Sequence, residues 1–199
     1  MCEEPAEYRP LNMDEVRKAI GRYVELTEEE WAEVRGCWQE RTFPKGAVIT
    51  ATGQVERWFS IVKEGAQRIY FENDGQEACI GFAYGGSWSG IFDSFVRQAP
   101  SRFVLQAVTP SVLLSIEHAD LERLYGLVPK MERFGRLMLE DIFVGRAVRE
   151  VEHLTMTAQE RYDRLIDRSP HLLQLVPQKD IASYLGMSAE TFSRLRARK

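Results

Sequence analysis

The stretch IASYLGMSAETFSRLRARK, residues 181–199, carries the clearest fold signal in the chain. A short helix predicted from Gln178 breaks at Gly186 and resumes as a second helix, which Ser188 caps. Two helices that cross closely need a small residue where they touch, and Ala182 stands there. The turn needs left-handed geometry four residues later, which glycine tolerates. The spacing predicts a helix-turn-helix, and the alternative is an ordinary helical hairpin that closes a domain.

Apolar residues at the right positions support this interpretation, namely Ile181, Leu185, Met187, Phe192 and Leu195. The formal net charge of −4 gives no overall sign of nucleic-acid binding. Positive charge is nevertheless concentrated at the end of the sequence, in Arg194, Arg196, Arg198 and Lys199. A local cationic face is therefore compatible with an acidic protein.

Composition places the chain among ordinary globular proteins. Its 199 residues allow one large domain or two small ones, with 44% hydrophobic and 28% charged residues. The acidic, polar start predicts no signal peptide, and no apolar run is long enough for a membrane span. Cys2, Cys37 and Cys79 are widely spaced and form no CxxC pair, which argues against a metal centre. We expect a cytoplasmic protein with unpaired thiols and no membrane contact.

In the first two thirds of the sequence, the predicted type of secondary structure changes at two points. Residues 1–42 predict helices, with Thr27 and Glu30 in capping-box spacing and a stripe of Trp31, Val34 and Trp38. Residues 43–116 predict short strands separated by turns, with no helices between them. Asp74-Gly75 marks a tight hairpin. This pattern is typical of an antiparallel barrel or jelly roll.

A long helix with one apolar seam is predicted at about 130–154. The seam can pack against the barrel or against a second copy of the chain, and we favour the second copy. The residues expected in that contact are Phe134, Met138, Ile142, Gly145 and Val148. A further helix begins at the capping box of Thr157 and Glu160 and ends before Pro170.

The segment VPQKDIASYLGMSAETFSRLRARK, residues 176–199, resembles the C-terminal helix-turn-helix of the Crp/Fnr family of bacterial transcription regulators. FPKGAVIT and FSIVKEGAQRIYFENDGQE resemble the first strands of that family's β-roll, and the resemblance covers residues 20–199. The segment ERYDRLIDRSPHLLQLVPQKDIASYLGMSAETFSR particularly resembles short members from Bacteroidetes-type bacteria. The implied fold is α+β: a sensory β-roll of the cyclic-nucleotide-binding type at 1–120, a dimerisation helix at 121–155 and a DNA-binding head at 156–199.

The resemblance also implies roles for the second head helix. Family members with a Ser-x-Glu-Thr-x-x-Arg pattern place the Glu and the Arg in the major groove, and Ser188, Glu190, Thr191 and Arg194 match it. A glutamate accepts from a cytosine amino group, and an arginine donates two bonds to guanine. Ser193 is expected to touch a base or a phosphate. Phosphate contacts are expected for Arg196, Arg198, Lys199 and Lys179.

Two departures from the family pattern affect the expected DNA binding. Ala189 occupies the family's first arginine position, so we expect a different operator sequence. The sequence ends with the recognition helix, so we expect a reduced or absent wing and a strong dependence on dimerisation. A two-fold dimer would meet half-sites about 34–36 Å apart on a palindrome.

The roll does not match the family's cyclic-nucleotide grip. Gly90 aligns with the family's glycine, but Ile91 stands where the ribose-binding glutamate belongs and Ser101 where the phosphate-binding arginine belongs. Arg102 is one residue away, which in a strand points it to the other face. The sequence therefore does not support cyclic-nucleotide binding by the family's usual route, and it identifies no cofactor. Another ligand in a pocket formed by Trp88, Gly90, Ile91, Phe92, Ser101 and Arg102 remains one expectation, and no ligand at all is the other.

Two other classes of protein are alternatives to a transcription regulator. A metal-dependent cupin enzyme needs histidines inside the barrel, and residues 43–117 contain none. No nucleophile elbow or phosphate loop is present, so we predict no enzyme, no catalytic residue and no metal. A dimeric ligand-binding adaptor with a vestigial head is the second alternative. We predict a homodimeric regulator of double-stranded DNA, with a small effector and RNA polymerase as the further partners that the resemblance implies.

Overall fold

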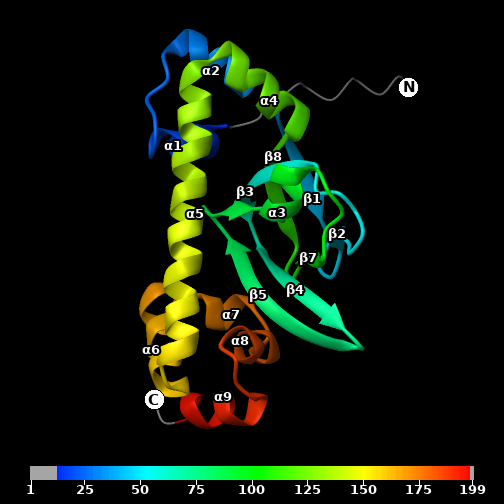
Figure 1. Ribbon diagram of the computed structural model, residues 1–199, viewed down its shortest axis with the longest axis vertical. Coiled ribbons are helices and arrows are strands. Elements are labelled where there is room, and N and C mark those ends of the chain that lie inside the picture. The colour runs from blue at the N-terminus through cyan, green and yellow to red at the C-terminus, as the bar shows by residue number, and fades with distance from the viewer. Residues whose placement is uncertain (1–12, 198–199) are drawn as a thin grey trace, which may run out of the picture.

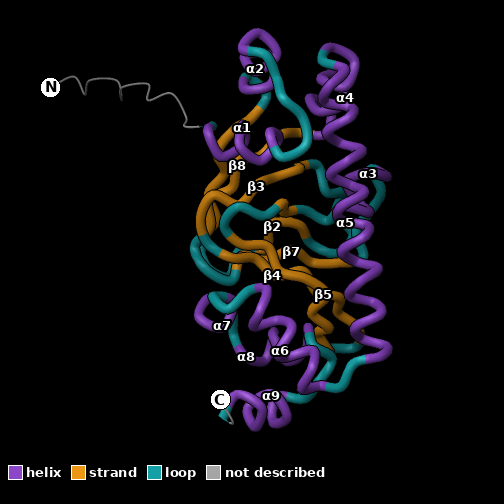
Figure 2. Tube along the Cα trace, turned by 90° about the vertical axis from the view of Figure 1, so that its left-hand side faces the viewer, coloured by secondary structure: helices purple, strands orange, loops and turns teal. Residues whose placement is uncertain are grey.

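The computed structural model describes residues 13–197, and Arg198 and Lys199 lie outside them. A long helix, α5, runs along the molecule beside a β-roll, and the remaining C-terminal helices form a compact head at one end (Figures 1 and 2). The helices are α1 Asp14–Gly21, α2 Glu28–Arg35, α3 Phe92–Arg97, α4 His118–Leu127, α5 Pro129–Thr155, α6 Ala158–Arg168, α7 Leu172–Leu175, α8 Gln178–Tyr184 and α9 Ala189–Arg196. The strands are β1 Trp38–Phe43, β2 Val48–Thr50, β3 Trp58–Glu64, β4 Ala66–Asn73, β5 Gln76–Tyr84, β6 Trp88–Ser89, β7 Phe103–Ala107 and β8 Ser111–Glu117.

The strands form two four-stranded antiparallel sheets, ordered β1-β8-β3-β6 and β2-β7-β4-β5. The predicted antiparallel roll is confirmed. At the predicted hairpin, Asp74 and Gly75 both have positive φ, 50° and 76°, which is the geometry of a tight two-residue turn. This hairpin of β4 and β5 extends from the roll towards the head (Figure 1).

Two local predictions are wrong. Trp38 does not continue the stripe of α2, because that helix ends at Arg35 and Trp38 begins β1. Its side chain is still buried, so burial alone did not distinguish helix from strand there. The β region also contains a helix, α3, between β6 and β7. The ring of Phe95 in α3 lies 6.0 Å from that of Phe59 in the roll. The six residues of α3 therefore form a helix that packs on the roll and not a strand within it.

The N-terminal half of α5 belongs to the chain's own core. Phe134 is fully buried and Met138 is 3% exposed, and both pack in the cluster that joins α1, α2 and the first sheet. The ring of Phe134 lies 6.5 Å from that of Phe59. The prediction that the apolar seam faces a second copy is therefore wrong for these two residues. Ile142 is also packed partly against this cluster.

The C-terminal half of α5 presents a different apolar surface. We call the five exposed residues the α5 stripe: Phe143, Val144, Val148, Val151 and Leu154. Leu154 is 79% and Phe143 73% exposed. Phe143 follows Phe134 by nine residues, about two and a half turns at 3.6 residues per turn, so the two rings point to opposite sides of the helix. Gly145 is exposed beside the stripe.

The turn between β3 and β4 depends on Gly65, whose φ is +87°. A Cβ there would lie 2.3 Å from the carbonyl oxygen of Pro110. We expect Gly65→Ala to lower the free energy of unfolding by about 1–3 kcal/mol, measured by urea denaturation. Gly53→Ala is the matched control, since Gly53 has φ +83° but nothing within 4 Å of its Cβ position. Equal losses in both variants would contradict the role of the close approach.

Among residues 13–197, no helix combines the length and the apolar character of a membrane span.

Candidate functional site

Two short helices, α8 and α9, are joined by a tight turn at the residues predicted for a helix-turn-helix. α8 ends at Tyr184, and Gly186 has φ +64°, the left-handed geometry that the turn was predicted to need. The backbone N–H of Met187 donates to the carbonyl of Ala182 at 3.0 Å. Ser188 caps α9 and accepts from the backbone N–H of Thr191 at 3.2 Å. The turn is therefore closed by hydrogen bonds as well as by glycine.

The inner face of the pair is apolar. Ile181 and Phe192 have no exposed surface, and Leu185 is 3% exposed. The ring of Phe192 meets that of Tyr162 on α6 edge to face, with centroids 5.6 Å apart. Of the predicted apolar positions, Met187 alone is only partly buried. α9 is thus fixed on one side by the core of the head, and its other side is left open.

The open side of α9 carries the predicted DNA-binding side chains. Glu190, Ser193, Arg194 and Arg196 are exposed, and α9 lies at the end of the molecule farthest from α2 (Figure 1). Glu190 and Arg194 are four residues apart and share one helix face. The Arg194 guanidinium donates to the Thr191 hydroxyl at 3.2 Å. Lys179 is exposed on the first turn of α8.

Glu190 is prepared as an acceptor. Hydrogen bonding to its own backbone N–H, then to the Ser188 hydroxyl, together with the charge of Arg194, lowers the pKa of Glu190 below its ordinary value. The carboxylate is therefore anionic at neutral pH, which suits an acceptor for a base amino group. The predicted contacts of Arg198 and Lys199 lie outside the described residues.

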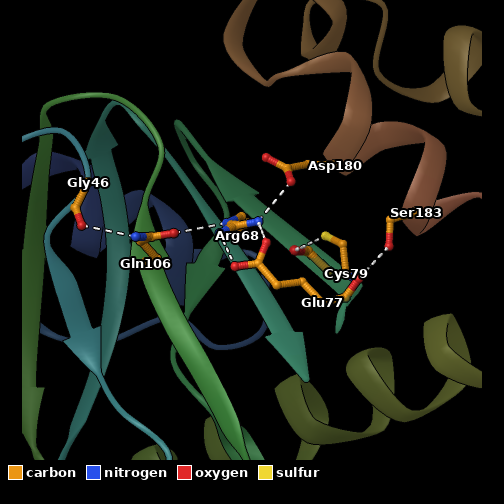
Figure 3. A network of polar contacts seen from close by, with 8 residues as sticks. Gly46, Arg68, Glu77, Cys79, Gln106, Asp180 and Ser183 are labelled. Atoms are coloured by element: carbon orange, nitrogen blue, oxygen red, sulfur yellow. Dashed lines mark hydrogen bonds and ion pairs between the residues drawn. The ribbon is translucent and has the colours of Figure 1, made fainter. Parts of the chain in front are cut away.

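A buried ion network joins the head to the roll (Figure 3). Arg68 of β4 donates to Asp180 of α8 at 2.8 Å and to Glu77 of β5 at 2.7 Å. Its Nε donates to Gln106 of β7 at 3.0 Å, and Gln106 continues to the carbonyl of Gly46. Burial opposes the charge of Arg68, but the two carboxylates together raise its pKa above the ordinary value. Asp180 is 5% exposed, so this is a desolvated contact.

A second set of contacts holds the turn of the helix-turn-helix. Arg149 and His153 of α5 both bond the carbonyl of Tyr184, at 3.1 and 3.0 Å. Arg161 of α6 donates to the carbonyl of Leu185 at 2.8 Å. These carbonyls end α8 and lack helical partners, so side chains from the neighbouring helices satisfy them. The long helix and the turn are therefore in direct contact.

The six residues of the predicted roll pocket are not brought into one site. Trp88 and Phe92 pack around Phe59, whereas Ile91 packs with Ile69 and Leu105. Ser101 is 3% exposed and bonds the backbone of Phe103, and Arg102 is exposed with its guanidinium over the Phe103 ring. Gly90, with φ +146°, forms the bend before Ile91. The predicted aromatic lining is thus largely core.

The structure shows a cavity that the sequence argument missed. It measures about 300 Å³ between the roll and α5 and is lined by Ile80, Phe103, Arg146, Arg149, Glu150 and His153. Arg146, Arg149 and His153 follow one another at steps of three and four, which places them on one face of α5. The spacing of these basic residues was the signal in the sequence that could have predicted the cavity. A helix face that only packs against an apolar roll does not need basic residues.

Comparison with known proteins assigns the β-roll to a domain family. Residues 40–126 match the cyclic nucleotide-binding domain family. FixK2 from Bradyrhizobium japonicum is similar in structure, with 20% identity, a TM-score of 0.72 and coverage of 81% of this chain and 83% of that chain. The Thermus thermophilus catabolite activator protein has 21% identity, a TM-score of 0.55 and coverage of 87% and 83%. A search of the curated proteins finds no match.

A third similar structure is CLP from Xanthomonas campestris, described as a c-di-GMP responsive global regulator, with 18% identity, a TM-score of 0.62 and coverage of 86% of this chain and 91% of that chain. Residues 40–126 therefore form a cyclic nucleotide-binding domain. The chain as a whole has the fold of these regulators, and the fold that the resemblance to the Crp/Fnr family implied is confirmed.

Proposed function

We propose that this protein is a sequence-specific DNA-binding regulator that acts as a homodimer on a palindromic operator. The observation that carries the proposal is the arrangement of α9. Phe192 and Leu195 fix one face in the core of the head, and Glu190 and Arg194 stand together on the exposed face. At this spacing the glutamate can accept a hydrogen bond from one base edge in the major groove, and the arginine can donate to another.

The α5 stripe supports dimerisation. It is a continuous row of large apolar side chains on the side of α5 away from the core. Monomeric proteins rarely expose such patches. A second α5 packed against the stripe would cover it and would set two α9 helices a fixed distance apart, as a palindrome requires. Gly145 and Val148, from the predicted dimer contact, lie on this exposed half.

The proposed gating by a small ligand has a route to the head. The cavity between the roll and α5 is lined by Arg149 and His153, and both side chains also bond the carbonyl of Tyr184 in the helix-turn-helix. A ligand that moves these side chains would change the support of the turn. This is a proposed regulation of the DNA-binding activity, and the identity of the ligand is part of what must be tested.

Arg194→Ala is expected to weaken binding to the selected operator by about 1–3 kcal/mol, or roughly 5-fold to 150-fold in affinity. The reason is the loss of two hydrogen bonds to a base edge. The operator is first obtained by selecting bound duplexes from random DNA with the wild-type protein. Affinities of both proteins are then measured over a salt series, and the specific loss should persist at every salt concentration.

Arg133→Ala is the matched control for this experiment. It removes the same charge from an exposed position near the start of α5, at the other end of that helix from the head. It should leave operator binding unchanged. Equal losses in both variants, or no enriched palindrome with the wild-type protein alone or with cyclic nucleotides and cell extract added, would contradict the proposal and favour a ligand-binding adaptor.

A further inference from the structure

A second cavity, of about 190 Å³, lies where the roll, the long helix and the head meet. Tyr84 lines it from the end of β5, Arg149 and His153 from α5, and α6 and α8 close it from the head. Pockets for drug-sized ligands begin at about 300 Å³, and one water takes up about 30 Å³ of liquid. We call this space the junction cavity. Its size suits a small molecule or a single charged group.

The junction cavity has an excess of positive charge. Arg149, Arg161 and Arg168 line it, together with one carboxylate, Glu152. Arg168 pairs with Glu152 at 2.5 Å. Arg149 and Arg161 donate to backbone carbonyls, and neither has a carboxylate oxygen within 4.0 Å in the part of the chain that the structure describes. Neither guanidinium is therefore in a direct ion pair, although the charge of Glu152 acts on Arg149 from a greater distance.

Arg149 is held where water solvates its charge poorly. Burial lowers the pKa of Arg149, and its Nε is buried with no hydrogen-bond partner among residues 13–197. The two ring nitrogens of His153 lie 3.2 Å from the carbonyl of Arg149 and 3.0 Å from that of Tyr184. An anion in the cavity would stabilise the buried guanidinium charge of Arg149.

We propose that the junction cavity binds a small oxyanion: a phosphate or carboxylate group, free or carried by a small metabolite. Arg149 and Arg161 would be its charge partners, through the N–H groups of their guanidinium ends that do not already donate to backbone carbonyls. The hydroxyls of Tyr84 and Ser169 are hydrogen-bonded to each other at 2.6 Å, which leaves one of their two hydrogens as a neutral donor at the wall. The site lies on the other side of Arg149 and His153 from the roll cavity at Ile80 and Phe103, and the two cavities share these residues as a wall.

Occupancy would have a mechanical consequence. Arg149 and Arg161 also hold the carbonyls of Tyr184 and Leu185, so the bound anion would fix the head against the long helix. This consequence rests on the proposed DNA-binding function, whereas the binding itself does not.

The test is isothermal titration calorimetry of the full chain with inorganic phosphate, pyrophosphate and citrate, each at an ionic strength held constant with sodium chloride. We expect one saturable site per chain for at least one of these anions. Arg161→Gln should weaken it roughly tenfold to a hundredfold, because a charge-assisted hydrogen bond is lost. Arg164→Gln, an exposed arginine of α6 outside the cavity lining, should bind like the wild type.

Arginine side-chain NMR of the wild-type protein keeps the test independent of how well the variants fold. The Nε–Hε signals of Arg149 and Arg161 should shift on titration with the bound anion, and that of Arg164 should not. No saturable binding by any of the three anions, or an equal loss with Arg164→Gln, would overturn the proposal. DNA is absent from these measurements, so such a failure would leave the proposed DNA-binding function untouched.

Discussion

Replacing Arg68 by alanine is expected to lower the free energy of unfolding by about 3–5 kcal/mol, one of the largest losses for a single substitution in this chain. The variant leaves Asp180, which is 5% exposed, without its partner at 2.8 Å. Removing one member of a buried ion pair is more harmful than replacing both, because the remaining charge has lost water as well as its partner. Urea denaturation of wild type and variant gives the difference directly.

Lys63→Ala is the control, since Lys63 also pairs with a glutamate on the roll, Glu40, at 2.9 Å. That pair is more exposed, with side-chain exposures of 27% and 28%, and should contribute only about 0–1 kcal/mol. The double variant Arg68→Met, Asp180→Leu should recover much of the loss. If Arg68→Ala is no more harmful than Lys63→Ala, the network does not hold the head to the roll.

The dependence on pH gives an additional check. Hydrogen bonding to Arg68 lowers the pKa of Glu77 below the ordinary value of 4.5. A carboxylate whose pKa is lower in the folded state contributes stability above its unfolded pKa, and the contribution is lost as the pH falls through the folded pKa. The difference between wild type and Arg68→Ala should therefore be complete above about pH 5 and should shrink in more acidic solution.

Local patterns were sufficient to predict the turn between α8 and α9. Gly186 and Ser188 act on their immediate neighbours, so sequence spacing alone contains the geometry that the structure shows. The tight turn at Asp74-Gly75 was predictable for the same reason. The position of Trp38 in a strand was not predictable in this way. A buried apolar residue that follows a helical stripe can belong to the helix or to the next strand, because both elements bury one side.

Contacts between distant parts of the chain were beyond such reasoning. Arg68 and Asp180 are 112 residues apart, and nothing in either neighbourhood indicates the other. The same limit explains the error on Phe134 and Met138. A seam of apolar residues indicates that one face of α5 is buried. It does not indicate whether the chain's own roll or a second copy of the chain buries it.

The exposed half of α5 allows a direct test of dimerisation, since Val151 lies within the α5 stripe with 57% of its surface exposed. Val151→Glu is expected to weaken the dimer more than about a hundredfold. In a two-fold contact each copy contributes the new charge, and like charges brought together at an interface are unfavourable by several kcal/mol. The monomer should fold normally, because the side chain is not part of the core.

Sedimentation equilibrium of wild type and variant measures this change, and Leu127→Glu is the control. Leu127 is 58% exposed at the end of α4, outside the stripe, so it introduces the same charge at an equally exposed apolar site. Val151→Glu should be monomeric at concentrations where Leu127→Glu is dimeric, and it should bind a single half-site only weakly. A dimer of undiminished stability in Val151→Glu would show that the two copies meet elsewhere. The α5 stripe would then need another partner, and the spacing of the two α9 helices could not be set by α5.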